Sequence, residues 1–220
     1  MDERLEQAQR LYDNAVFGGD VSAPVEADRL LNAVEAELSM ARGRVIHARF
    51  LAGSASTTAV PEDDGAELAL FERADELFKS RGDLSGEAQS QFWIGTSHQV
   101  ARHDDSSAVP ALQRARALAT EVDDPLTLSD ALRHLGVAEH HAGRLGAARS
   151  YLEESTRLRR LLGFGPGVAA NLVGLAYLAA GDGCQDEVAA LLDEADDIAS
   201  QSNAAGIARQ IHEAREYLTH

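Results

Sequence analysis

The chain has 220 residues and a formal net charge of −16; 45% of its residues are hydrophobic and 5% are aromatic. This composition is enough for a core built mainly from alanine and leucine. The acidity excludes nucleic acid held through its phosphates, because such binding needs clustered Lys and Arg. A single cysteine, Cys184, excludes an internal disulfide and a four-cysteine zinc site.

The N-terminal residues MDERLEQAQR do not have the basic and apolar regions of a signal peptide. No apolar run in the sequence approaches the length of a membrane span. We therefore expect a cytoplasmic protein without a membrane partner.

Apolar residues recur at helical spacing along the whole chain, and no segment alternates as a strand does. The pattern predicts helices at residues 2–17, 25–38, 40–52, 66–80, 85–102, 107–121, 126–142, 145–162, 167–180, 185–200 and 204–219. The five prolines fall in predicted turns or in first helical turns, which supports these boundaries. The longest predicted loop, residues 54–65, carries no aromatic or basic anchor, so we expect it to be mobile. The predicted fold class is all-α.

Residues 131–162 have the pattern of one helical hairpin. Leu132 and Leu135 lie on the apolar stripe of its first helix, Ala148 and Leu152 on that of its second, and Gly136 allows the two helices to approach closely. Similar patterns occur around Gly95 and Gly174, which are 41 and 38 residues from Gly136. A hairpin of this size cannot bury both faces alone, so we expect neighbouring hairpins to stack.

This pattern resembles the tetratricopeptide repeat family, whose signature pairs an apolar residue and glycine in a first helix with alanine, an aromatic residue or leucine, and alanine in a second. The long period resembles the helical repeat arms of large bacterial transcription regulators. The resemblance covers roughly residues 42–200. The half-unit with Glu67, Phe71 and Ala74 is clear, but its partner helix near residues 45–51 lacks the glycine.

The resemblance implies a right-handed α-solenoid of about five helical hairpins that forms a single domain, residues 1–220. Residues 1–40 are expected to be an N-terminal helical cap or a degenerate repeat, residues 41–200 the repeats, and residues 203–219 a capping helix.

Motifs for familiar chemistry are missing from the sequence: there is no phosphate loop ending in Gly-Lys-Ser/Thr, no HExxH and no GxSxG. GFGPG at residues 163–167 is interpreted as a turn between repeats, and HEARE at residues 212–216 as part of a solvated terminal helix. We expect no cofactor. Arg157, Arg159 and Arg160 are interpreted as cations at the end of a helix, with an anion-binding patch as the alternative.

The resemblance implies that the first helices of successive hairpins line a concave groove. By helical spacing, the groove is expected to present a mixture of a cation, amides, imidazoles and apolar walls. Its candidate residues are Phe92, Thr96, Gln99, Arg133, Val137, His140, His141, Asn171 and Leu175. Such a surface suits a short peptide or a small polar molecule, and a solvated helix face is the alternative interpretation.

His98 and Glu139 occupy the position at which Tyr177 gives its repeat an aromatic packing residue. We expect both to be at least partly buried. Together with His140 they suggest a metal or acid–base site, and the alternative is a hydrogen-bonded pair that only joins two repeats.

The leading hypothesis is a non-enzymatic module that binds a peptide or helix of a partner protein in the groove. The alternative is a small-molecule or metal site, catalytic or not, centred on His98, Glu139 and His140. A homodimer through the N-terminal helices, with Leu11, Tyr12, Val16 and Phe17, is a third reading.

Overall fold

The structure is a computed structural model that describes residues 2–54 and 65–218. Those residues form helices and turns and contain no strand, so the predicted all-α class is confirmed for them. None of the described helices combines the length and the apolar character needed to cross a membrane. The loop predicted at residues 54–65 lies almost wholly outside the described residues.

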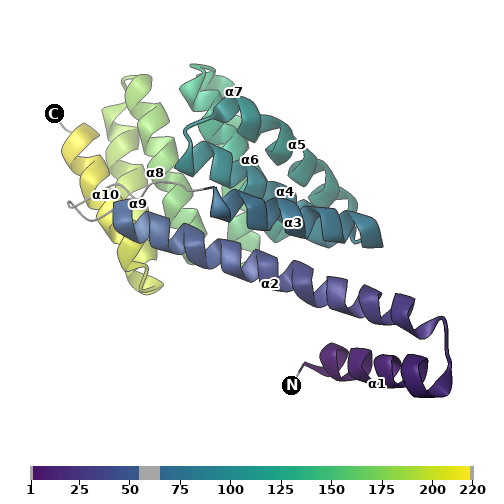
Figure 1. Cartoon of the computed structure of the whole chain (residues 1–220). Helices are drawn as coiled ribbons and strands as arrows, with labels where there is room; N and C mark the ends of the chain where they lie inside the picture. The colour runs from purple at the N-terminus through teal and green to yellow at the C-terminus, as the bar shows by residue number, and fades with distance from the viewer. Residues whose placement is uncertain (1, 55–64, 219–220) are drawn as a thin grey trace. The chain divides into compact units, whose positions relative to one another are not determined.

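Helices follow one another along the chain, with short turns between them except between α2 and α3, where residues 55–64 are outside the described part (Figure 1). They are α1 Glu3–Gly18, α2 Ala23–Ser54, α3 Ala66–Arg81, α4 Leu84–Thr96, the π-helical turn η1 Ser97–Ala101, α5 Asp105–Glu121, α6 Pro125–His141, α7 Leu145–Leu161, α8 Gly165–Gly181, α9 Gln185–Gln201 and α10 Ala205–Leu218. From α3 onward, these bounds agree with the predicted ones to within about two residues at most ends.

The second and third predicted helices, residues 25–38 and 40–52, are one continuous helix of 32 residues, α2. The separation was wrong because Ser39 and Met40 provide no helix-breaking residue. The helix near residues 45–51 was expected to lack the glycine of the other hairpins, but α2 contains a glycine at a close approach to its partner helix, Gly43. A Cβ on Gly43 would lie 2.5 Å from the Phe71 ring of α3. The Phe71 side chain therefore packs against bare backbone.

The turns from α5 onward recur at a constant interval. Residues with positive φ are His103, Asp123, Gly143, Gly163, Gly183 and Asn203, so successive turns lie 20 residues apart. The interval from Gly82 to His103 is one residue longer, and that interval contains η1. A π-helical turn accommodates one extra residue within a helix, so η1 absorbs the excess.

One proline departs from its predicted place. Pro110 was expected in a turn or first helical turn, but α5 begins at Asp105 and encloses it. Pro110 has no amide hydrogen to donate to the preceding turn. Pro61 lies outside the described residues.

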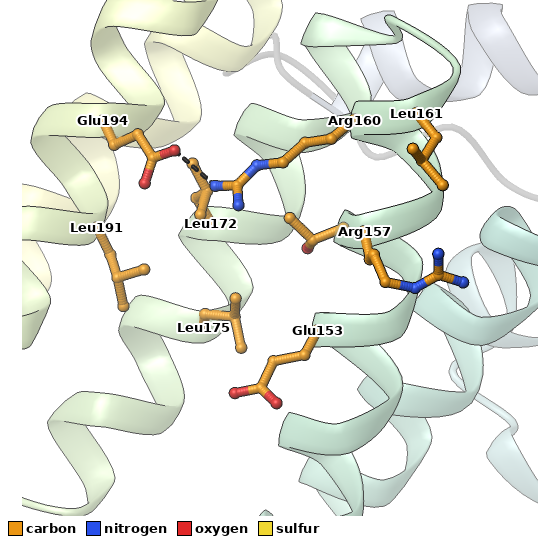
Figure 2. A pocket seen from close by; sticks show the side chains of 9 residues that line it. Glu153, Arg157, Arg160, Leu161, Leu172, Leu175, Leu191 and Glu194 are labelled. Carbon is orange, nitrogen blue, oxygen red and sulfur yellow. Dashed lines mark hydrogen bonds and ion pairs between the residues drawn. The ribbon is translucent and has the colours of Figure 1, made fainter.

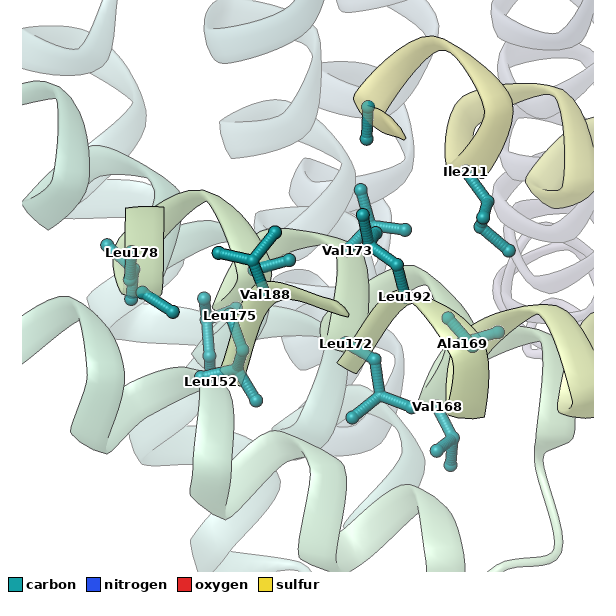
Figure 3. Packing of buried hydrophobic residues seen from close by; sticks show 14 of the residues in the cluster. Leu152, Val168, Ala169, Leu172, Val173, Leu175, Leu178, Val188, Leu192 and Ile211 are labelled. Carbon is teal, nitrogen blue, oxygen red and sulfur yellow. The ribbon is translucent and has the colours of Figure 1, made fainter. Parts of the chain in front are cut away.

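The chain divides into two compact units, Met1–Leu118 and Ala119–His220. In the first unit, α1 lies alongside the first half of α2 (Figure 1), and Phe71, Met40 and Leu77 belong to a core shared by α2 and α3. In the second unit, Leu152, Leu172, Leu178 and Leu192 belong to a core formed by α7, α8, α9 and α10 (Figure 3).

Candidate functional site

The second unit contains a polar cluster between α6, α7 and α8, which we call the arginine cluster. Its members are Ser129, Asp130, Arg133, Ser155, Arg159 and Asn171. Residues 130 and 133 are one helical turn apart on α6, and residues 155 and 159 are one turn apart on α7. Each pair therefore presents two polar side chains to the same side of its helix.

Arg159 is the most fully bonded member of the arginine cluster. It is only 4% exposed. Its Nη2 donates to Asp130 Oδ1 at 2.5 Å, and its Nη1 donates to the Gly167 carbonyl and to Asn171 Oδ1, both at 2.9 Å. The guanidinium also lies 5.6 Å from the centre of the Phe164 ring. Arg159 therefore holds the start of α8 against α6 and α7.

Arg133 is bonded along one edge only. Its Nη1 donates to the Ala170 carbonyl at 2.9 Å and to Asn171 Oδ1 at 3.0 Å. No described carboxylate forms an ion pair with it, because Asp130 is paired with Arg159. A guanidinium has five N–H donors, so those on Nε and Nη2 remain for water or a ligand.

Asn171 connects the two arginines. It is fully buried, its Oδ1 accepts from both guanidinium groups, and its Nδ2 donates to Ser155 Oγ at 2.9 Å. The Ser155 hydroxyl in turn donates to the Ser129 carbonyl at 2.6 Å. Both polar atoms of the Asn171 side chain thus have hydrogen-bond partners.

The arginine cluster contains two cations and one anion. Burial, and secondarily the nearby charge of Arg159, lowers the pKa of Arg133 to about 10, against the opposing effect of Asp130. Burial also lowers the pKa of Arg159, although Asp130 opposes that change. Burial raises the pKa of Asp130, against the effect of Arg159. The arginine cluster therefore has a net positive charge at Arg133, and an anionic group of a ligand would stabilise it.

The second feature of α6 is a pocket at its C-terminal end. His140 lines it with Tyr177, Gly181 and Ala180 from α8 and with Tyr217 and Leu218 from α10, and its volume is about 470 Å³. Burial, and secondarily the neighbouring His141, lowers the pKa of His140. The imidazole is therefore neutral at neutral pH, and the pocket presents aromatic and uncharged surface.

Arg133 and His140 lie on one side of α6, because seven residues are nearly two helical turns. Val137, half-buried, lies between them. Arg133 and the His140 pocket are thus the two ends of a stripe along α6, roughly 10 Å apart at a rise of 1.5 Å per residue. His141 is exposed beside this stripe.

The other predicted groove residues lie elsewhere. Leu175 is buried on α8 and lines a pocket of about 680 Å³ between α7 and α9, beside Leu172 and Leu191 (Figure 2). The Arg160–Glu194 ion pair crosses the rim of that pocket.

Phe92, Thr96 and Gln99 belong to the first unit and are all buried. The Thr96 hydroxyl donates to the Phe92 carbonyl, and Gln99 Nε2 donates to Asp105 Oδ1 at 2.7 Å. These bonds give Thr96 and Gln99 structural roles within their own unit.

His98 and Glu139 are half-buried, as expected. The Glu139 carboxylate is paired with Arg144, which lowers its pKa. In η1, His98 Nδ1 and Ser97 Oγ are buried without hydrogen-bond partners. Across the described ranges, no three His, Cys, Asp or Glu side chains gather as metal ligands do.

A buried His–Glu pair that sequence reasoning missed occurs in the first unit. His47 Nδ1 lies 3.1 Å from Glu67 Oε1, the Glu67 side chain is only 2% exposed, and the His47 ring meets Trp93 edge-on. Glu67 was recognised only as part of a repeat pattern. The pair could not be anticipated because α2 was divided and its Gly43 contact was not recognised.

Comparisons of the chain with protein-family models and with curated proteins found no match.

Proposed function

We propose that this chain is a non-enzymatic helical-repeat module that binds a peptide or helix segment of a partner protein along the stripe from Arg133 to His140. The observation that supports this proposal most is Arg133, a half-buried guanidinium that has two protein acceptors and, among the described residues, no ion-pair partner and no acceptor for its Nε and Nη2 donors. Binding of a peptide uses a cation that is held in a fixed position, and it does not require catalytic groups.

The ligand consistent with this site has two parts. An acidic group would pair with the open edge of Arg133, and an apolar or aromatic side chain would enter the pocket of His140, Tyr177 and Tyr217. Asn171 serves the site indirectly, because it fixes the guanidinium from behind. The architecture that goes with this proposal is a right-handed solenoid of tetratricopeptide type, in which α6, α8 and α10 line one surface.

The test is a selection from a random-peptide display library on the whole chain, followed by calorimetry of the selected peptides. We expect a shared acidic residue, and about a tenfold or greater loss of affinity on Arg133→Met. Arg157→Met is the matched control, because Arg157 is exposed and paired with Glu154. Peptides without an acidic group, or with equal affinity for both variants, would contradict the proposal.

A second candidate is a small-molecule site at His98, one of the three residues (His98, Glu139 and His140) of the alternative site expected from the sequence. It is favoured by the buried, unpartnered Nδ1 of His98 and the Oγ of Ser97 within a π-helical turn, since such turns often occur at functional sites. Thermal-shift screening of small polar molecules on wild type and on His98→Ala tests this candidate, and equal shifts for the two proteins contradict it.

A further inference from the structure

The hairpin formed by α1 and α2 has an unusual amount of exposed apolar surface. Fifteen large apolar side chains are exposed among the described residues, and ten of them lie between Leu5 and Leu51. Tyr12 and Val16 on α1 are each more than half exposed, and Leu31 on α2 is 42% exposed. Clusters of this kind mark interaction sites, whereas scattered exposed apolar residues do not.

Four of these ten side chains, Leu5, Tyr12, Val16 and Leu31, line a groove of about 560 Å³ between α1 and α2. On α1 it follows Leu5, Tyr12 and Val16, and on α2 it follows Ala27 and Leu31. The α1 positions are eleven steps apart from Leu5 to Val16, or roughly 16 Å at 1.5 Å per residue. The groove therefore matches about three turns of a helix laid along the hairpin, as in other helix-in-groove complexes.

The borders of the groove are acidic. Asp28 is the charged residue that lines it. Arg4 directly precedes Leu5 and is bound to Glu37, so this side of α1 faces α2. The residues that directly follow Leu5 and Tyr12 therefore lie on the opposite border of the groove, away from α2. Those positions are Glu6 and Asp13, both exposed.

The negative charge of the hairpin formed by α1 and α2 favours some ligands of the groove over others. Residues 2–38 contain nine acidic residues and three arginines. A second copy of the chain would bring an equally acidic hairpin against the first, at an electrostatic cost. An amphipathic helix whose apolar stripe is flanked by Lys or Arg would instead pair with Asp28, Glu6 and Asp13 while its apolar side chains cover Tyr12 and Leu31.

We propose that the groove between α1 and α2 binds an amphipathic helix with basic borders from another protein. This site lies in the first unit, so it is separate from the Arg133 site of the second unit.

The experiment measures binding of a fluorescein-labelled 18-residue peptide of Leu and Lys, with leucine at helical spacing, to the whole chain by anisotropy. Two control peptides accompany it: a scrambled isomer, and a version with Glu in place of Lys. We expect the amphipathic Leu/Lys peptide to bind about tenfold more tightly than either control.

Two matched variants locate the site. Leu31→Glu places a charge in the groove, whereas Leu126→Glu makes the same change at a similarly exposed leucine, 47% exposed, of the second unit. We expect Leu31→Glu to weaken binding about tenfold and Leu126→Glu to leave it unchanged. The added negative charge alone would strengthen binding of a basic peptide, so a loss indicates apolar docking.

Asp28→Lys keeps the proposal testable if Leu31→Glu fails to fold, as monitored by circular dichroism. Asp28 is exposed, and reversing its charge should weaken the Leu/Lys peptide and strengthen the Leu/Glu peptide. Equal affinity for the helical and scrambled peptides would overturn the proposal. So would a dimer in sedimentation analysis that Leu31→Glu dissociates and Leu126→Glu does not, because the occupant would then be a second copy.

Discussion

At the scale of single residues, the two arginines of the arginine cluster differ in how they are neutralised. Arg159 is paired with Asp130 and stabilises the junction of three helices. Arg133 carries the surplus charge at the edge of the cluster. Asn171 determines the position of both guanidinium groups, so it is the residue on which the cluster depends most.

Replacing Asn171 with alanine should destabilise the chain by about 3 kcal/mol. The substitution removes an acceptor shared by two charged donors and leaves Ser155 Oγ without its donor. Chemical denaturation measures the change. Asn14→Ala, at an exposed helical position, is the control and should change stability by no more than about 0.5 kcal/mol. Equal effects of the two variants would contradict the structural role of Asn171.

Arg133→Met should stabilise the chain by about 1 kcal/mol while abolishing the proposed peptide binding, because it removes a desolvated charge that Arg159 repels and that Asp130, already paired with Arg159, only partly offsets. Thermal unfolding at pH 8 measures the gain, with Arg157→Met as the control.

The gain in stability on Arg133→Met should depend on pH in a defined direction. Folding lowers the pKa of Arg133 from the usual value of a guanidinium to about 10, so the cost of its charge is fully present below pH 10 and declines as pH rises toward that usual value. The difference between Arg133→Met and wild type should therefore shrink above pH 10. A variant less stable than wild type at pH 8 would show that Arg133 is needed for folding.

Sequence reasoning placed Arg133 and Asn171 in one candidate site, and the structure brings them into direct contact. Arg159 was interpreted as a cation that offsets the carbonyl end of its helix, with an anion-binding patch as the alternative, but its side chain is buried and pairs with Asp130. Helical spacing alone does not distinguish these cases, because the direction of Arg159 depends on where α6 and α8 pack against α7. That information is tertiary.

At the scale of elements, the glycines show where helices approach most closely. Gly43 faces Phe71 and Gly95 faces Leu112, where an added Cβ would lie 2.5 Å and 2.6 Å from those side chains. Helix existence was predictable from apolar spacing throughout, and most ends from glycine, proline and polar caps. The continuity of α2 was not predictable, because the apolar patterns before and after Ser39 could each belong to a separate helix.

Gly43→Ala should destabilise the first unit by about 1–3 kcal/mol, since the methyl group must displace the Phe71 ring from its packed position. Gly146→Ala is the control. It is also helical but has no atom within 4 Å of the added Cβ, so it should leave stability unchanged or raise it by up to about 0.5 kcal/mol. Denaturant midpoints compare the two variants. If Gly43→Ala left the denaturant midpoint unchanged, the α2 and α3 helices would have to separate easily.

At the scale of the whole molecule, the chain consists of two compact units whose boundary falls within α5. The packing of consecutive helices against one another was predictable from the recurring pattern. The division into two compact units was not, because every predicted hairpin has a similar composition. The two proposed binding surfaces lie on different units, so each is testable without the other.

Residues 122–220 should fold when expressed alone, because the large apolar core of α7, α8, α9 and α10 lies wholly within them. Circular dichroism and thermal unfolding should show a helical fragment with a cooperative transition. The matched fragment is residues 1–121. A fragment 122–220 that stays unfolded would show that the two units fold only together.

The turns at positions 103, 123, 143, 163, 183 and 203 divide this part of the chain into equal lengths. An in-frame gene duplication of any forty residues taken from it would add one complete hairpin, and every later turn residue would keep its phase. A duplication of thirty-eight or forty-one residues, the two glycine steps visible in the sequence, would shift the left-handed turn residues relative to their helices. Only η1 shows how a single extra residue is absorbed, so growth of this chain by whole hairpins is the change that its backbone accommodates most readily.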